Sequence, residues 1–303
     1  MKSRIQLTAN TAPLLLIGSG LTQYVGAALA IVLFTQVTPA AVAWWRVAVA
    51  ATVFILWRRP WRMRLSRVDW GRSALFGVVM TLMNVLFYEA ISRIALGVAV
   101  SLEFLGPVAV AVMGSKHWTS RVAAVAALAG VVSISGFGVN VQDPKTALGI
   151  VFALGAGACW AGYIVLGQRI ASQRSGIDSL AIGTLAGAIV FLPFCLTQIP
   201  KVVASPVLIG AVLGVGLLST VVPYSLEALA MSKVHASVFA LLTALLPATS
   251  LLVGAVALQQ FPAWPSVIGL VLISLAVAVA SRDTTQGAQN AREVIENAEG
   301  ISD

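Results

Sequence analysis

Charged side chains are scarce in this sequence. Asp, Glu, Lys and Arg make up 10% of its 303 residues, whereas roughly 25% is typical of a soluble domain. Hydrophobic residues reach 59%, above the roughly 45–50% of soluble proteins. The shortage of charge excludes an ordinary soluble domain and predicts an all-α polytopic membrane protein.

Cysteines and enzyme signatures are also sparse. Cys159 and Cys195 lie in apolar runs without a CxxC partner, so neither a disulfide framework nor a metal site is predicted. The sequence contains no Walker-type GxxxxGK, no HExxH and no GxSxG motif. We therefore expect no cofactor and no ATP-driven transport by this chain alone. A membrane enzyme or a non-transporting membrane protein remains the remote alternative.

The basic residues lie mainly between the hydrophobic runs. The net charge is +8, but this distribution favours membrane-flanking loops over a nucleic-acid-binding face. With the N-terminus inside, fifteen of the 19 basic residues face the cytoplasm, three face outward, and Arg46 is left within a span. Because basic loops are retained in the cytoplasm, both termini are predicted to be cytoplasmic.

Ten apolar segments are long enough to cross a bilayer, whose hydrocarbon core of about 30 Å needs roughly 20 residues per helix. They cover residues 13–34, 39–57, 73–91, 97–115, 121–139, 147–167, 179–198, 206–227, 235–257 and 263–281. An acidic tail, which we expect to be flexible, follows over residues 283–303.

An internal repeat divides the ten segments into two halves, residues 1–143 and 144–282. A shift of 140 residues places SRIALGVAVSLEFLGPVAVAVMG over SKVHASVFALLTALLPATSLLVG, with a serine, a proline and a glycine keeping one spacing. A shift near 137 aligns LIGSG with LGAGA; chance similarity of apolar helices is the alternative. Five helices per repeat is an odd number, so the halves must be inverted relative to each other. Inverted repeats around a central cavity are typical of secondary carriers.

Glu103 interrupts the fourth segment near its middle. A charged carboxylate there is costly, by about 2.5–3.5 kcal/mol on insertion scales, so it must face a polar space, find a partner or be protonated. Because apolar surroundings favour the neutral form of a carboxyl group, Glu103 is the candidate for proton coupling. The alternative is a neutral carboxyl hydrogen-bonded to a neighbouring helix.

Two prolines mark equivalent kinks in the two halves. Pro107 lacks the N–H that would bond the carbonyl of Glu103, and Pro247 likewise frees the carbonyl of Thr243. Exposed carbonyls in broken helices often line the sites of transporters, although proline also occurs in membrane helices for packing reasons.

Arg46 is the only cation within a predicted span. It could pair with Glu103, bind a substrate carboxylate through its planar fork, or extend its side chain to the membrane interface. Glu89 and Arg93, four residues apart, are expected to form a structural pair on one helix. Five further polar or aromatic residues within spans could bind a substrate or serve packing roles: Asn84, Tyr88, Trp160, Tyr163 and Tyr224.

The two-repeat pattern, with LFYEAISRIALGVAVSLEFLGPVAVAV in the first half, resembles the drug/metabolite transporter superfamily in its EamA-type branch. The LEFxGP, GACW and PYSLE elements resemble the subgroup of bacterial inner-membrane threonine/homoserine exporters. The resemblance covers the chain up to about residue 282.

The resemblance implies an efflux carrier for small amino acids, driven by proton exchange and located in the bacterial inner membrane. It places Glu103, Tyr88, Trp160, Tyr163, Tyr224 and Thr243 among the residues lining a central cavity. Export of another metabolite or a drug through the same fold remains open, as does the oligomeric state.

Overall fold

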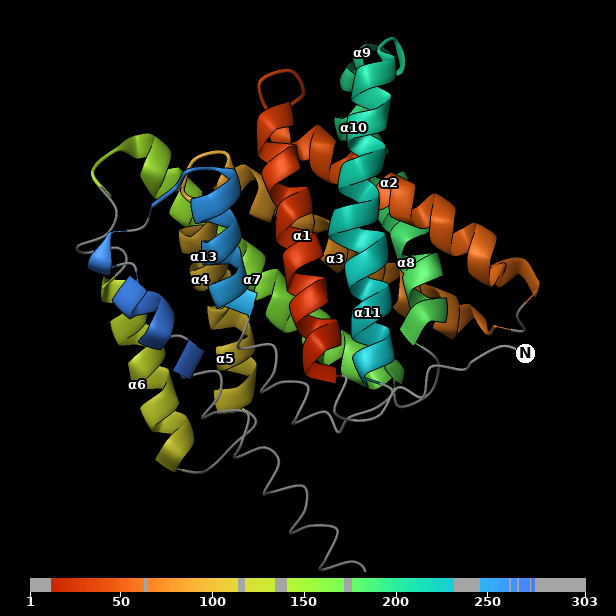
Figure 1. The fold of residues 1–303 in the computed structure, drawn as a ribbon. Helices are drawn as coiled ribbons and strands as arrows, with labels where there is room; N and C mark the ends of the chain where they lie inside the picture. The colour runs from red at the N-terminus through yellow and green to blue at the C-terminus, as the bar shows by residue number, and fades with distance from the viewer. Residues whose placement is uncertain are drawn as a thin grey trace, which may run out of the picture.

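The computed structural model describes residues 12–62, 65–113, 118–133, 141–171, 176–231, 246–261, 263–265, 267–272 and 274–275. Within these residues the secondary structure is helical, without strands. The α-helices are α1 Ala12–Leu33, α2 Pro39–Arg58, α3 Arg67–Ile91, α4 Leu96–Glu103, α5 Leu105–Met113, α6 Trp118–Ser133, α7 Pro144–Ala171, α8 Gly176–Phe191, α9 Ile199–Val203, α10 Pro206–Gly216, α11 Val222–Met231 and α13 Leu246–Ala257 (Figure 1).

Several of these helices have the length and composition of membrane spans. Among the described residues, five helical segments pass this test, and a sixth does if the pair Asp178–Phe194 and Leu196–Val203, bent by 80°, is one span. The five are Leu14–Leu33, Pro39–Arg62, Arg67–Ile91, Pro144–Gly167 and Pro206–Glu227. The prediction of an all-helical membrane protein is therefore confirmed.

Local sequence explains where the helices begin. Ser66 caps α3 in a capping box: its side chain accepts a hydrogen bond from the Asp69 backbone N–H, and the Asp69 carboxylate accepts one from the Ser66 backbone. Proline occupies a first-turn position in α2 and in α10, where its missing N–H removes no helical bond. These signals fix the ends of the long apolar segments.

The fourth predicted span is interrupted at the residue where the sequence predicts a kink. The α4 helix ends at Glu103, and α5 begins at Leu105, two residues before Pro107. The freed Glu103 carbonyl oxygen faces Gly157 of α7, where a Cβ atom would lie 2.8 Å from it. The missing side chain at Gly157 thus lets α7 approach the break closely.

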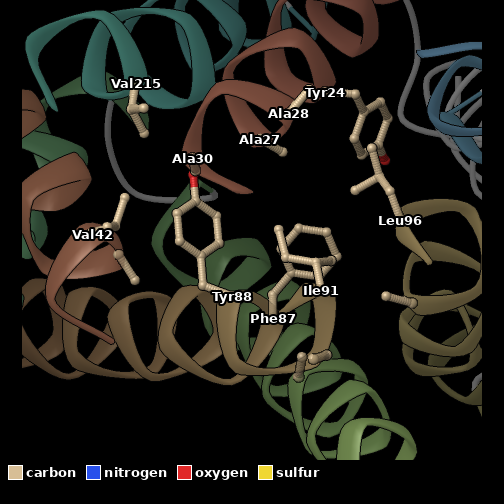
Figure 2. Packing of buried hydrophobic residues seen from close by; sticks show 14 of the residues in the cluster. Tyr24, Ala27, Ala28, Ala30, Val42, Phe87, Tyr88, Ile91, Leu96 and Val215 are labelled. Carbon is tan, nitrogen blue, oxygen red and sulfur yellow. The ribbon is translucent and has the colours of Figure 1, made fainter. Parts of the chain in front are cut away.

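Helices distant in sequence pack together around two centres. The α3 helix packs against α7 and α8, while α1 packs against α11 and α13 and lies beside the α10–α11 segment in Figure 1. The larger apolar core lies between these helices; in Figure 2, Phe87 and Tyr88 project from α3 towards Ala27 and Ala28 of α1. This packing brings polar residues of α1, α2, α3 and the α10–α11 segment close together.

Candidate functional site

Arg46 lies within α2 and is almost completely buried, with 2% of its surface exposed. Its Nε donates a hydrogen bond to Oγ1 of Thr220, and its Nη2 donates one to the carbonyl oxygen of Ser219, both at 2.6 Å. Its guanidinium carbon lies 5.5 Å from the centre of the Tyr88 ring, within the range of a cation–π contact. Within the described residues, Arg46 forms no ion pair with a carboxylate. We name Arg46, Tyr88, Ser219 and Thr220 the Arg46 cluster.

The carbonyl of Ser219 is available to Arg46 because of Pro223. Proline has no N–H with which to bond the carbonyl four residues earlier, which is that of Ser219. Just before Pro223 the helix widens into a π-turn, η6, over Leu217–Val221. Single π-turns within α-helices often occur at functional sites. The proline and the π-turn together leave a backbone oxygen free for the guanidinium.

Helix α1 completes the surroundings of Ser219. The Ser219 hydroxyl lies 3.4 Å from the Gln23 carbonyl oxygen and 3.4 Å from the Tyr88 hydroxyl. At Gly26 of α1, a Cβ atom would lie 2.8 Å from the Ser219 backbone nitrogen. Glycine at this position allows α1 to contact the π-turn, so the Arg46 cluster is enclosed on the α1 side.

Glu103 is buried at the C-terminal end of α4, with 8% of its surface exposed. It lies close enough to Arg46 for electrostatic attraction but does not form an ion pair with it. The direct Arg46–Glu103 pair, one of the alternatives raised by the sequence, is therefore absent from this conformation.

A second carboxyl group, Glu227 of α11, also experiences the charge of Arg46. It accepts a hydrogen bond of 2.8 Å from the hydroxyl of Ser19 on α1. Asn84 donates to the carbonyl of Met80 on its own helix at 2.8 Å and also interacts with the Tyr224 side chain. The structure thus gathers one cation and two carboxyl groups from four helices.

The other predicted site residues lie in aromatic contacts or outside the described residues. Trp160 packs edge-to-face on Phe104, with ring centres 4.6 Å apart, and Tyr163 stacks on Phe76 at 4.6 Å. Pro247 is buried in the first turn of α13. Thr243 falls outside the residues that the structure describes, so its pairing with Glu103 across the repeat stays a prediction.

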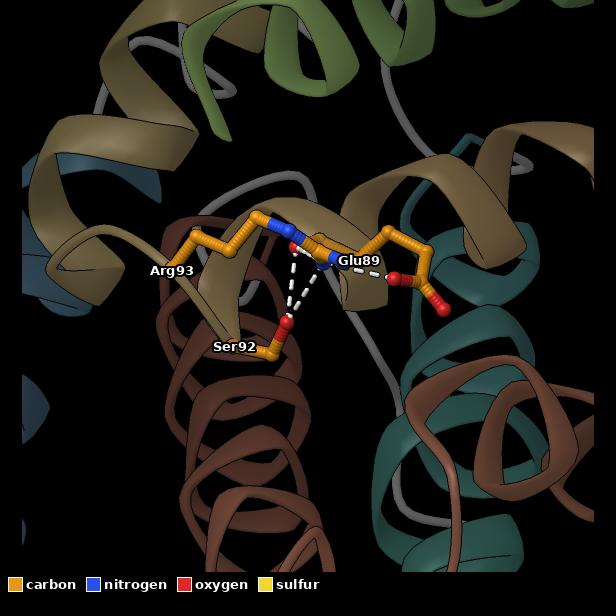
Figure 3. Close-up of polar contacts among 3 residues, drawn as sticks. All are labelled: Glu89, Ser92 and Arg93. Atoms are coloured by element: carbon orange, nitrogen blue, oxygen red, sulfur yellow. Dashed lines mark hydrogen bonds and ion pairs between the residues drawn. The ribbon is translucent and has the colours of Figure 1, made fainter. Parts of the chain in front are cut away.

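Glu89 and Arg93 form the predicted pair on one helical face. Nη1 of Arg93 lies 2.6 Å from Oε2 of Glu89, and it also donates to the Glu89 carbonyl and to the Ser92 hydroxyl (Figure 3). The guanidinium carbon lies 5.0 Å from the centre of the Phe152 ring on α7. The expected structural role of this pair is consistent with its local contacts.

Sequence reasoning missed the polar partners that hold Arg46. Ser219 and Thr220 are small hydroxyl residues of a kind common in membrane helices. The available signal was Pro223, because the rule that identified the Glu103 carbonyl four residues before Pro107 also identifies Ser219. In the described part of the chain, no group of three or more His, Cys, Asp or Glu side chains could hold a metal ion.

The model of the EamA-like transporter family matches residues 147–282. The threonine/homoserine exporter RhtA of Escherichia coli K12 is 36% identical over 235 residues, which cover 78% of this chain and 79% of the relative. The chain belongs to the EamA-like transporter family. The predicted resemblance to this family and its threonine/homoserine exporters is thereby confirmed.

Other members of the family are similar over comparable lengths. RhtA of Salmonella typhimurium LT2 is 32% identical over 84% of both chains, and the uncharacterized transporter YwfM of Bacillus subtilis is 26% identical over 80% of this chain. A crystal structure with 20% identity matches with a TM-score of 0.57, covering 89% of this chain and 96% of that chain. At that identity the match indicates a shared fold alone.

Proposed function

We propose that this protein is a secondary active exporter of small amino acids such as threonine and homoserine, working by proton antiport and alternating access. The observation that carries the substrate class is the 36% identity to a threonine/homoserine exporter over 78% of the chain. The bacterial relatives favour the inner membrane as its location, and the basic loops favour cytoplasmic termini.

The architecture we propose has ten transmembrane helices in two inverted repeats, residues 1–143 and 144–282, followed by the tail over residues 283–303. Glycine contacts support it. A Cβ atom at Gly20 would lie 2.8 Å from Leu246, and one at Gly106 would overlap the carbonyl oxygen of Gly157. The two shifts found in the sequence relate Gly20 to Gly157 and Gly106 to Leu246, so one contact maps onto the other.

Helix packing supports the same arrangement. The first helix of the chain, α1, packs against α11 and α13 of the second half. In the proposed repeat α1 corresponds to α7, which packs against α3, α4 and α5 of the first half. Each half therefore inserts its first helix between helices of the other, an exchange that suits alternating access around a central site.

Glu103 is our candidate for the proton-carrying group. It is the buried carboxyl at the break between α4 and α5, and it lies within the field of Arg46. A carboxyl group that exchanges its proton as the two halves rock would link proton entry to amino-acid exit.

Flux measurements in proteoliposomes containing the full-length protein test this function. An imposed pH gradient should drive movement of radiolabelled threonine or homoserine above the level of protein-free liposomes. Failure of the gradient to drive either substrate would overturn the proposal. Competition by a panel of metabolites, followed by direct flux of any hit, would then identify a different substrate of the same carrier.

A further inference from the structure

We propose that Arg46 binds the carboxylate of the exported amino acid, which replaces the Ser219 carbonyl and the Thr220 hydroxyl as partner of the guanidinium. This inference rests on the proposed export of amino acids. It assigns the carboxylate-binding group and adds that the π-turn occupies that group when substrate is absent.

The first support is the unbalanced chemistry around Arg46. A buried cation is costly unless an anion and hydrogen bonds compensate it. In the described part of the chain, Arg46 has two neutral oxygen partners and an aromatic face, without an ion-paired carboxylate. By contrast, Arg58 and Arg93 each have an acidic partner at 2.6 Å. Only the most buried of these three arginines therefore lacks one.

The second support is the geometry of the two bonds. Nε and Nη2 form one edge of the planar guanidinium, and each donates to an oxygen at 2.6 Å. This edge is the fork that binds both oxygens of a carboxylate in parallel. The Ser219 and Thr220 oxygens thus take the positions of two carboxylate oxygens, and charge-assisted bonds to a real carboxylate would be stronger.

The third support is the location of the Arg46 cluster between the two halves. Arg46 and Tyr88 belong to the first half, whereas Ser219 and Thr220 belong to the π-turn of the second. The charged groups whose fields reach Arg46 are Glu103 and Glu227, from one half each. A zwitterionic amino acid has one group for the cation and one for a carboxylate, so the set matches both of its charges.

The first experiment needs no variant. The thermal stability of the purified full-length protein is followed with increasing L-threonine and, in parallel, L-threoninamide, which lacks the carboxylate. We expect threonine to stabilise the protein with an affinity at least about tenfold higher than the amide, because a site built for a polar group rejects an analogue that lacks it. Equal affinities would overturn the inference and leave threonine export standing.

Variants then locate the carboxylate. Arg46→Gln should reduce the preference for threonine over the amide to less than about twofold, and Arg46→Lys should restore part of it because the charge remains without the fork. Arg93→Gln is the matched control: it removes an arginine paired within its own helix and should leave the preference unchanged. A full preference retained in Arg46→Gln would show that another residue binds the carboxylate.

Thr220→Val supplies a test that does not depend on the folding of Arg46 variants. Removing one competing partner should tighten threonine binding by about two- to tenfold, the equivalent of one hydrogen bond, without tightening binding of the amide. Weaker threonine binding would contradict the exchange of partners. If threonine neither binds to nor is transported by the wild-type protein, the proposed function fails, and this inference fails with it.

Discussion

At the scale of single residues, buried charge separates structural from functional candidates. Arg93 and Glu89 lie four residues apart and satisfy each other on one helix face, which any helical geometry allows. Arg46 and Glu103 are more deeply buried, lie on different helices and interact only through their fields. Groups that bind and release charged species must be free to change partners, which the second pair is.

Replacing Glu103 by Gln should abolish proton coupling. The amide keeps the size of the side chain but cannot exchange a proton, so pH-driven threonine flux is expected to fall to the level of protein-free liposomes. The matched control is Glu89→Gln, a carboxyl already held by Arg93, which should retain gradient-driven flux. Wild-type pH dependence in Glu103→Gln would remove its proton role.

Asp143 provides a pH dependence outside the membrane. It precedes the first turn of α7 and accepts bonds from the Thr146 hydroxyl at 2.6 Å and the Thr146 backbone N–H at 3.0 Å. These hydrogen bonds, led by that of the hydroxyl, lower the pKa of Asp143. Its stabilisation is therefore complete above the pKa of the unfolded chain and is lost as pH falls through the lower, folded pKa.

The corresponding measurement is thermal unfolding between neutral and acidic pH. Asp143→Ala should melt below the wild type at neutral pH, and the gap should narrow on acidification. Asp143→Asn keeps an uncharged cap oxygen, so its own contribution should not vary with pH. A gap between Asp143→Ala and wild type that stays constant to acidic pH would contradict this role.

At the scale of elements, glycine determines how closely the helices cross. The contact between α3 and α8 passes through Gly77 and Gly183, where a Cβ atom at Gly77 would overlap the backbone of Gly183. Small residues at crossings let membrane helices pack backbone to backbone. The sequence shows these glycines but not which pairs meet, because that depends on the relative position of two helices.

Gly77→Ala should therefore destabilise the protein by about 1–3 kcal/mol, the usual cost of overpacking, or more if α3 and α8 separate. Gly71→Ala is the control on the same helix, because a Cβ atom there would meet no atom within 4 Å. Thermal unfolding in one detergent compares the two variants. Equal melting temperatures would show that the crossing tolerates a side chain.

At the scale of the whole molecule, the two halves exchange their first helices. Helix α1 packs against α11 and α13, while α7 packs against α3, α4 and α5. This mutual insertion makes the interface between halves large, and it places the Arg46 cluster at that interface. Motion of one half against the other would therefore alter the surroundings of Arg46 directly.

Reporter fusions test the predicted orientation. Green fluorescent protein joined to the C-terminus should fluoresce, and alkaline phosphatase at the same position should be inactive, because both reporters would be cytoplasmic. A phosphatase fusion truncated after Gln142, in the loop before α7, should be active because five spans precede it. An active phosphatase at the C-terminus would overturn the proposed orientation of the chain.

The sequence by itself determined the membrane class, the family, most helix positions and the Glu89–Arg93 pair. These features depend on composition or on spacing within one helix, which the chain specifies directly. The break between Glu103 and Leu105 was likewise predictable, because Pro107 removes a particular backbone hydrogen bond.

Only the tertiary structure decided the partners of Arg46. Thr220 and Ser219 lie 174 and 173 residues away, in a π-turn whose free carbonyl needs Pro223 and whose position needs the packing of α1 and α2. A residue pattern states what each helix can offer, but the meeting of a buried cation with a particular oxygen depends on how helices cross. For that physical reason, the sequence identified Arg46 as a candidate and the fold supplied the site around it.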